Sequence, residues 1–327
     1  MKQMQNYEWK SDFSPLINDF LEQYRLAGFK FEKQERILQH FDRFCTMQGY
    51  AGLELKKYVL EEFIYDKREQ KSTHYVKEVV MLQFADFMIK RGYSAYRIGH
   101  RYQLPRSKYI PHIYTTEEKQ RFFYALDHYP TTKRSYRNDV DPELFRFLCC
   151  TGARLSEALN LKKEDYDPEN GTVFIRGAKN NRNRIIPLSA SLNKRLNKYV
   201  KRFLTELTDE EYLFPSIAGG KMDKSTAYVH FRDYLLLADI PHDDKGPRIH
   251  DFRHGLAVEN LRRWAKEGAD MSNKLPYLSA YMGHSDFRAT QYYLRLTAEI
   301  YPEMVEMMEK ACFDIIPEGG LEDNAEN

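Results

Sequence analysis

Four side chains between residues 154 and 293 have the chemistry that a reaction at phosphorus needs. Arg154 lies in TGARLSEALNL, His250 and Arg253 lie in HDFRH, and Tyr293 ends the stretch MGHSDFRATQYY. Two guanidinium groups can hold one phosphodiester, because each is planar, donates bidentately and stays charged. A tyrosine hydroxyl can attack the phosphorus if a positive field or a histidine acting as a base offsets its pKa near 10. The pattern therefore predicts attack of a tyrosine on a phosphodiester.

The three stretches resemble the signature boxes of the tyrosine recombinases, the integrase family of site-specific DNA recombinases. The family pattern is an arginine after Thr-Gly, a lysine on a β-hairpin, His-x-x-Arg, Gly-His, and a tyrosine nine residues beyond that histidine. These positions are filled in order by Arg154, Lys179, His250, Arg253, His284 and Tyr293. The resemblance covers residues from about 112 to 297. It implies cleavage through a 3′-phosphotyrosyl intermediate, with the hairpin lysine as general acid and with no metal, ATP or other cofactor.

Some assignments leave alternatives open. Tyr292 and Tyr293 share one broad helical stripe, so amphipathicity does not choose between them, and only the family spacing selects Tyr293. Other basic residues of the hairpin turn compete with Lys179 and can instead hold backbone phosphates. Glu157 is expected to orient the first arginine or to cap its helix. His254 lies four residues after His250, and the pair has the spacing of a metal site on a helix, but no carboxylate or cysteine completes such a site.

Helices and one hairpin must position these residues. Apolar residues at intervals of three and four predict helices over 14–29, 31–50, 53–70 and 72–93, and then over 115–129 and 142–161, where a glycine interrupts the last pattern. Residues 172–175 and 184–188 alternate as a hairpin, and the remainder to residue 316 is expected to be helical. The fold class is therefore mainly α with a small β-hairpin or sheet. A helical core-binding bundle is expected at 1–110, and a mixed α/β tyrosine-recombinase catalytic domain at 111–327.

A basic segment at about 88–115 joins the two expected domains. It has no acidic residue, and lysines and arginines alternate there with tyrosines. Such a segment can follow a phosphate backbone, and its alternative role is that of a linker kept soluble by charge. The residues predicted to contact DNA here and in the hairpin are Arg97, Arg101, Arg106, Lys108, Arg182 and Arg184.

The charge distribution favours a polyanionic partner. The net charge is only +2, but residues 297–327 hold nine acidic residues and one lysine, a local charge of −8, so residues 1–296 carry +10. We expect double-stranded DNA with a specific recombination site as partner. We also expect a homo-oligomer, a tetramer on DNA, assembled through an amphipathic helix at about 298–316 that precedes an acidic tail. Without an apolar run of about 18 residues or a secretion signal, the chain is expected in the cytoplasm and not at a membrane.

Two other functions fit the same residues less well. A type IB topoisomerase uses the same arginine, lysine, histidine and tyrosine chemistry, but the Gly-His-to-tyrosine box favours a recombinase. A catalytically silent DNA-binding protein is disfavoured by the intact set of six residues. The stretch YLRLTAEIYP is similar to recombinases encoded by transposons, so integration, excision or transposition of a mobile element is the expected role. Base-reading side chains cannot be told apart from those that only hold phosphates, so the target sequence stays open.

Overall fold

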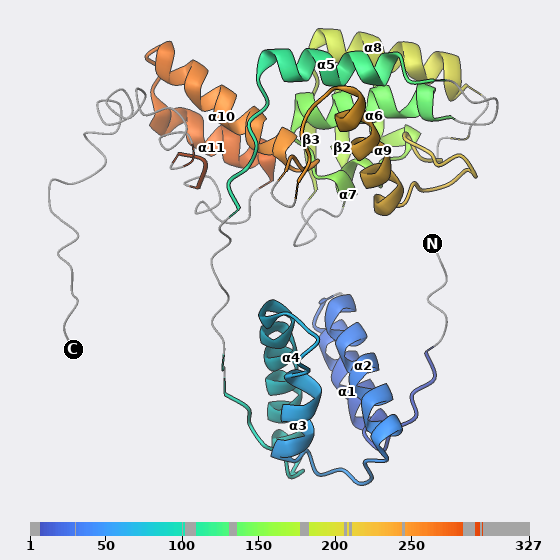
Figure 1. Ribbon diagram of the computed structural model, residues 1–327, viewed down its shortest axis with the longest axis vertical. Coiled ribbons are helices and arrows are strands. Elements are labelled where there is room, and N and C mark those ends of the chain that lie inside the picture. Colours follow the sequence, from blue (N-terminus) through green and yellow to red (C-terminus); the bar gives the residue numbers. More distant parts are fainter. Residues whose placement is uncertain are drawn as a thin grey trace, which may run out of the picture. The chain divides into compact units, whose positions relative to one another are not determined.

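The computed structural model describes residues 7–29, 31–99, 101, 109–130, 136–176, 183–205, 208, 211–243, 246–283, 292–294 and 296. The chain divides into two compact units, residues 1–108 and residues 109–327 (Figure 1).

The first unit is built of helices that pack on α4. Its described helices are α1 (Ser14–Leu26), α2 (Glu32–Gln48), α3 (Lys57–Ile64) and α4 (Lys71–Lys90). α4 contacts each of the other three, and its Phe84 packs edge-on against Phe20 of α1 with ring centroids 5.5 Å apart. Both rings are fully buried, as the apolar spacing of these helices requires.

The helix predicted at 53–70 is shorter than expected. α3 covers only Lys57–Ile64, and it starts late because Leu55 is extended and pairs with the chain after α4. The Leu55 amide donates to the Ser94 carbonyl at 3.0 Å, and the Tyr96 amide donates to the Leu55 carbonyl at 2.8 Å. A backbone pairing across 40 residues therefore overrides the local helical pattern here.

The second unit contains helices and a small antiparallel sheet. The described helices are α5 (Thr116–Asp127), α6 (Arg137–Thr151), α7 (Leu155–Ala158), the 3-10 turn η1 (Lys163–Asp165), α8 (Ala190–Phe203), α9 (Lys224–Leu237), α10 (Asp251–Lys266) and α11 (Met271–Met282). The strands β1 (Tyr166–Asp167), β2 (Thr172–Ile175) and β3 (Arg184–Pro187) lie in the order β1-β2-β3. α6 packs against α5, α8 and α10 (Figure 1). The expected class, mainly α with a small β element, is confirmed.

Local signals set most of these boundaries. Thr115 caps α5, since its hydroxyl accepts from the Glu118 amide at 3.1 Å and the Glu118 carboxylate accepts from the Thr115 amide at 2.8 Å. The predicted hairpin is also confirmed, with Ile175 opposite Arg184. α6, however, begins at Arg137 and runs through Pro142, which sequence reasoning took as its start. β1 was not predicted, because two residues are too few to show an alternating pattern.

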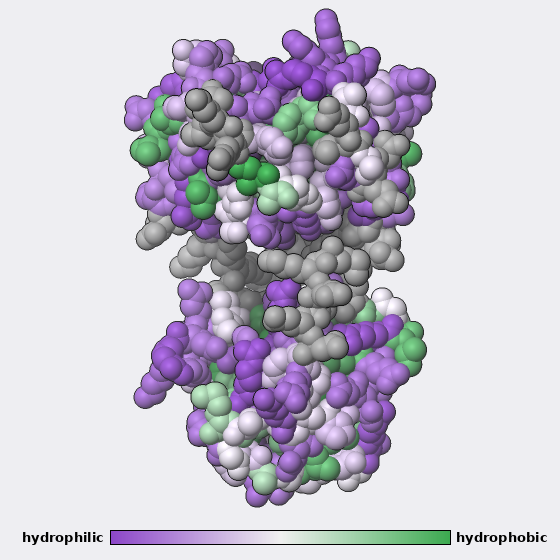
Figure 2. All heavy atoms as spheres, turned by 90° about the vertical axis from the view of Figure 1, so that its right-hand side faces the viewer, coloured by the Kyte–Doolittle hydropathy of each residue, from purple (hydrophilic) through white to green (hydrophobic). Residues whose placement is uncertain are grey.

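The surface of the described part is polar. Figure 2 shows mostly hydrophilic side chains on the face in view, with hydrophobic ones in small scattered patches. Among the described residues, no helix combines the length and the apolar character that crossing a bilayer demands.

Candidate active site

The turn between α6 and α7 presents the first arginine. Gly152 ends α6 with φ +61°, and a Cβ there would lie 2.9 Å from Leu256 Cδ2 of α10. Both the left-handed backbone and the close approach favour glycine. Arg154 follows as the N-cap of α7, with 24% of its side chain exposed.

Arg154 and Arg253 hold consecutive carbonyl groups at the end of α11. Arg253 is 2% exposed, and its guanidinium donates to the Gly152 carbonyl at 2.7 Å and to the Met282 carbonyl. Arg154 Nη2 donates to the Gly283 carbonyl at 3.3 Å. Three segments that are far apart in the sequence therefore meet at the two guanidinium groups, directly before position 284.

Glu157 joins Arg154 to the hairpin. Its Oε1 accepts from Arg154 Nη1 at 2.7 Å and its Oε2 accepts from the Arg154 amide at 2.9 Å, so it both orients the arginine and caps α7, as predicted. Arg184 of β3 binds the same carboxylate at 3.1 and 2.8 Å. Burial would raise the pKa of Glu157, but the hydrogen bonds from Arg184 and the Arg154 amide lower it to about 2. The carboxylate is therefore charged at neutral pH.

His250 lies directly before α10 and is an exposed residue. Its pKa is lowered to about 4, first by desolvation and then by the positive charges of Arg253 and Arg154. The ring is thus neutral at pH 7, and a neutral imidazole can accept a proton. Desolvation likewise lowers the pKa of Arg253 to about 10, which leaves it charged at neutral pH.

The first turn of α10 is fixed by a contact that sequence reasoning missed. Tyr109 donates a hydrogen bond to the buried Asp251 carboxylate, next to His250, and the Arg248 guanidinium lies 3.7 Å above the Tyr109 ring. Tyr114 is 3% exposed and stacks on Phe252 with centroids 4.9 Å apart. These two tyrosines of the basic segment therefore pack into the second unit, where burial outweighs the expected role at a DNA backbone.

Tyr293 packs on α10 and α11 within the same chain. It is 3% exposed, and its ring centroid lies 5.4 Å from that of His254. Burial raises its pKa, whereas the charge and hydrogen bonding of Arg253 and the charge of Arg154 lower it. Tyr292 is only half-buried. Tyr293, nine residues after position 284, thus lies close enough to Arg253 and Arg154 for their charges to lower its pKa.

The other predicted residues are placed as follows. Lys179 and His284 lie outside the described residues, as do Arg106, Lys108 and Arg182. Arg97 pairs with Asp86 at 2.6 Å, and its side chain stays 63% exposed. The Arg101 amide donates to Glu78 at 3.1 Å, and its guanidinium lies 4.4 Å above the Tyr65 ring. Arg184, also predicted to contact DNA, has a side chain 11% exposed that pairs with Glu157.

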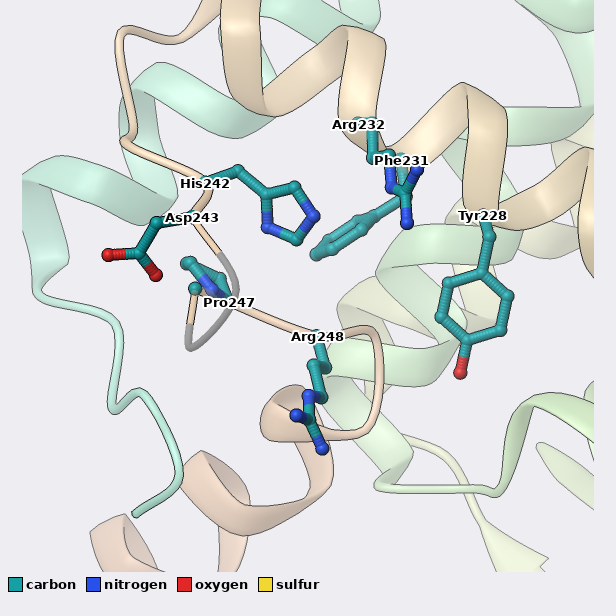
Figure 3. Close-up of a pocket in the computed structure, with 8 residues that line it drawn as sticks. Tyr228, Phe231, Arg232, His242, Asp243, Pro247 and Arg248 are labelled. Carbon is teal, nitrogen blue, oxygen red and sulfur yellow. The ribbon is translucent and has the colours of Figure 1, made fainter. Parts of the chain in front are cut away.

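A pocket of about 460 Å³ lies beside the segment that leads into α10. Figure 3 shows the His242 ring pointing into it towards Phe231 of α9, with Arg248 near its other side. Arg232 and Arg248 line the pocket and are exposed. Cationic side chains in such a hollow suit a polyanion.

Residues 115–299 match the model of the phage integrase family, and this segment is more than half of the chain. The chain belongs to the phage integrase family of tyrosine recombinases. It is therefore an enzyme that cuts and rejoins DNA in site-specific recombination.

Several known proteins are similar to this chain over most of its length. The protein named integrase/recombinase y4rB of Sinorhizobium fredii is 30% identical, over 93% of this chain and 99% of that protein. Tyrosine recombinase XerA of Thermococcus onnurineus is 26% identical, over 86% of this chain and 93% of that protein. The Tn1549 transposon integrase bound to circular intermediate DNA has a TM-score of 0.60 at 16% identity, covering 85% of this chain and 94% of that one. That structural likeness shows a common fold.

Proposed function

We propose that Tyr293 is the nucleophile with which this recombinase cuts DNA. Its hydroxyl oxygen attacks the scissile phosphorus, a phosphotyrosyl bond forms at the 3′ side, and the bond to the 5′ oxygen breaks. The 5′ hydroxyl then attacks the corresponding bond of a partner strand and releases the tyrosine. One phosphoester bond replaces another at each step, so no external energy source is required. The observation that carries this proposal is that Tyr293, 3% exposed, packs against α10, the helix that bears Arg253, where the charges of Arg253 and Arg154 lower its pKa against the effect of burial.

The proposed roles follow from charge and proton balance. Arg154 and Arg253 hold the phosphate oxygens, where loss of one such donor typically costs about 3 to 4 kcal/mol of barrier. His250, neutral at pH 7, accepts the proton of the tyrosine. Lys179 gives a proton to the departing 5′ oxygen, and His284 completes the set.

Burial of Tyr293 sets a condition on this mechanism. A buried phenol resists ionisation, and the Arg253 guanidinium counteracts that resistance. The hydroxyl must therefore lose its proton close to Arg253, whose charge stabilises the phenolate that forms. The exposed His250 and the partly exposed Arg154 mark the side from which the phosphate can enter.

A nicked DNA substrate that carries the target site tests this function. Cleavage beside the nick releases a short strand that cannot return, so the covalent protein–DNA adduct accumulates. We expect an adduct with wild type and with Tyr292→Phe, and none with Tyr293→Phe, because only the latter lacks the nucleophile. An adduct of undiminished yield with Tyr293→Phe, or its loss only with Tyr292→Phe, would contradict the assignment.

We further propose that the recombinase acts as a homo-oligomer, a tetramer, on double-stranded DNA with a specific recombination site. One structure of similar fold is a lambda integrase dimer bound to a COC′ core site, with a TM-score of 0.59 at 15% identity. The proposed contact is the amphipathic segment at about 298–316, which lies outside the described residues. Removal of residues 298–327 should weaken cooperative binding to paired sites and spare binding to a single site. Unchanged cooperativity in a gel-shift series would refute this contact.

The DNA is proposed to run against the basic surface of the second unit near Arg232 and Arg248, with the first unit as the core-binding domain. The role is proposed to be movement of a mobile element in the cytoplasm. A circular junction of the DNA that flanks the gene should then form in cells that express the wild-type chain, and not with Tyr293→Phe. Absence of any such junction with wild type would argue for another role.

A further inference from the structure

Arg184 is the first residue of β3, and its guanidinium faces the interior of the second unit. Nη1 and Nη2 bind the two oxygens of Glu157 at 3.1 and 2.8 Å, and Nε donates to the Tyr281 carbonyl at 3.0 Å. A Cβ on Gly283 would lie 2.8 Å from Nη1, so the guanidinium packs directly against the turn before position 284. One side chain thus connects the base of the hairpin, α7 and the end of α11.

Sharing of the Glu157 carboxylate has an electrostatic consequence. Glu157 is 7% exposed and binds Arg154 as well, at 2.7 Å. A carboxylate paired with Arg154 alone would form a neutral pair and would draw the guanidinium towards itself. With a second guanidinium on the same carboxylate, the three side chains carry a net charge of +1. Arg154 then keeps a positive field for a phosphate.

A direct phosphate contact explains these observations less well. A guanidinium that holds a phosphate needs N–H groups that protein acceptors do not already occupy. All three guanidinium nitrogens of Arg184 donate to Glu157 or to the Tyr281 carbonyl. The planar bidentate geometry on Glu157 also suits arginine and not lysine.

We propose that Arg184 is a positioning residue of the recombinase, which shares the Glu157 carboxylate with Arg154 and so keeps Arg154 charged and oriented for the scissile phosphate. This rests on the proposed role of Arg154 in holding that phosphate. Arg184 itself touches neither the DNA nor the reacting atoms.

A double-mutant cycle on the full chain tests the proposal. The variants are Arg184→Met, Glu157→Gln and the two combined, and the readouts are the single-turnover rate of adduct formation at saturating nicked DNA and the Kd from gel shift. We expect Arg184→Met to slow adduct formation about 10- to 100-fold with little change in Kd, since the carboxylate then neutralises Arg154. Addition of Glu157→Gln should restore the rate at least about fivefold, because the amide carries no charge.

The control is a matched ion pair away from the site. Arg195 of α8 binds the 7% exposed Glu143 of α6 in the same two-pronged way, at 2.9 Å for each contact. Arg195→Met removes a comparable pair and should leave adduct formation unchanged. If Arg184→Met does not fold, as judged by circular dichroism, Arg184→Lys replaces it in the cycle. Because lysine keeps the positive charge beside Glu157 and loses only the bidentate contact, Arg184→Lys should slow adduct formation less than a neutral residue would, and Glu157→Gln should then give little rescue; a large rescue in this background would contradict the charge argument.

Three results would overturn the proposal. A combined variant no faster than Arg184→Met would mean that Arg184 acts through packing alone. A weaker Kd at unchanged adduct rate, with a salt dependence reduced by about 0.9 in log–log slope, would mean a direct phosphate contact. An equal loss with Arg195→Met would mean a general effect on stability. Failure of the wild type to form any adduct would instead refute the proposed function, so the two failures are distinguishable.

Discussion

Replacement of Gly283 by alanine probes the convergence of Arg184, Glu157 and α11 directly. Gly283 ends α11 with φ +65°, and an added Cβ would lie 2.8 Å from Arg184 Nη1 and 2.9 Å from Arg184 Cζ. A Cβ does not approach a non-bonded heavy atom so closely, so either the guanidinium or the turn must move. The guanidinium cannot move without loss of its contacts with Glu157.

The expected cost has two parts. Alanine in the left-handed region costs about 1 to 2 kcal/mol. Displacement of the guanidinium weakens two hydrogen bonds between charged groups, each worth roughly 1.5 to 3 kcal/mol, of which relaxation recovers a part. Gly283→Ala should therefore lower the free energy of unfolding of the second unit by about 3 to 5 kcal/mol. It should also slow adduct formation, because the Gly283 carbonyl accepts from Arg154.

Gly268 provides the matched control. It follows α10 with φ +64°, and a Cβ there would meet no atom within 4 Å. Gly268→Ala should therefore cost only the backbone part, about 1 to 2 kcal/mol, with unchanged adduct formation. The comparison isolates the contact with Arg184.

Tryptophan fluorescence during urea unfolding of the full chain measures the cost in the second unit. The two tryptophans are Trp9 in the first unit and Trp264 in α10, so a Trp9→Phe background leaves Trp264 as the only reporter. Equal losses for the two glycine variants would refute the packing of Arg184 against Gly283. A normal adduct rate with Gly283→Ala would refute the link to Arg154.

Two further predictions concern α10. Tyr109→Phe removes the hydrogen bond to the buried Asp251, so it should lower the free energy of unfolding by about 1 to 3 kcal/mol and slow adduct formation. Tyr124→Phe, at a residue 65% exposed, should change neither quantity. Equal behaviour of the two variants would contradict the anchoring role of Tyr109. Because the pKa of His250 is lowered to about 4, the ring gains its proton only as the pH falls towards that value, so the cleavage rate should stay level from about pH 8 to about pH 6. A fall in rate with a midpoint near pH 6.5, where an ordinary histidine titrates, would contradict this environment.

Short-range signals made much of the fold predictable. Thr115 and Glu118 mark the start of α5, the alternating residues on both sides of the hairpin turn give β2 and β3, and the Thr-Gly step before Arg154 gives the break between α6 and α7. The convergence of Arg154 and Arg253 followed from family spacing and not from local propensity.

Long-range contacts account for what the sequence did not reveal. Tyr109 binds Asp251, which lies 142 residues further along the chain. No local pattern shows such a contact, so the basic neighbours of Tyr109 suggested a DNA contact. Arg184 and Glu157 are 27 residues apart, and no periodic pattern links an arginine in a hairpin to a glutamate on a short helix. The shortened α3 has the same origin, since Leu55 pairs with Ser94.

Identification of the residue that carries the DNA tests the central claim most directly. Adduct formed on a nicked substrate can be digested with protease and nuclease, and the peptide that retains a nucleotide can be sequenced by mass spectrometry. We predict a single modified peptide, with the phosphate on Tyr293 and the nucleotide attached through its 3′ oxygen. A nucleotide on Tyr292 or on any other side chain, or attachment through a 5′ phosphate, would contradict the account.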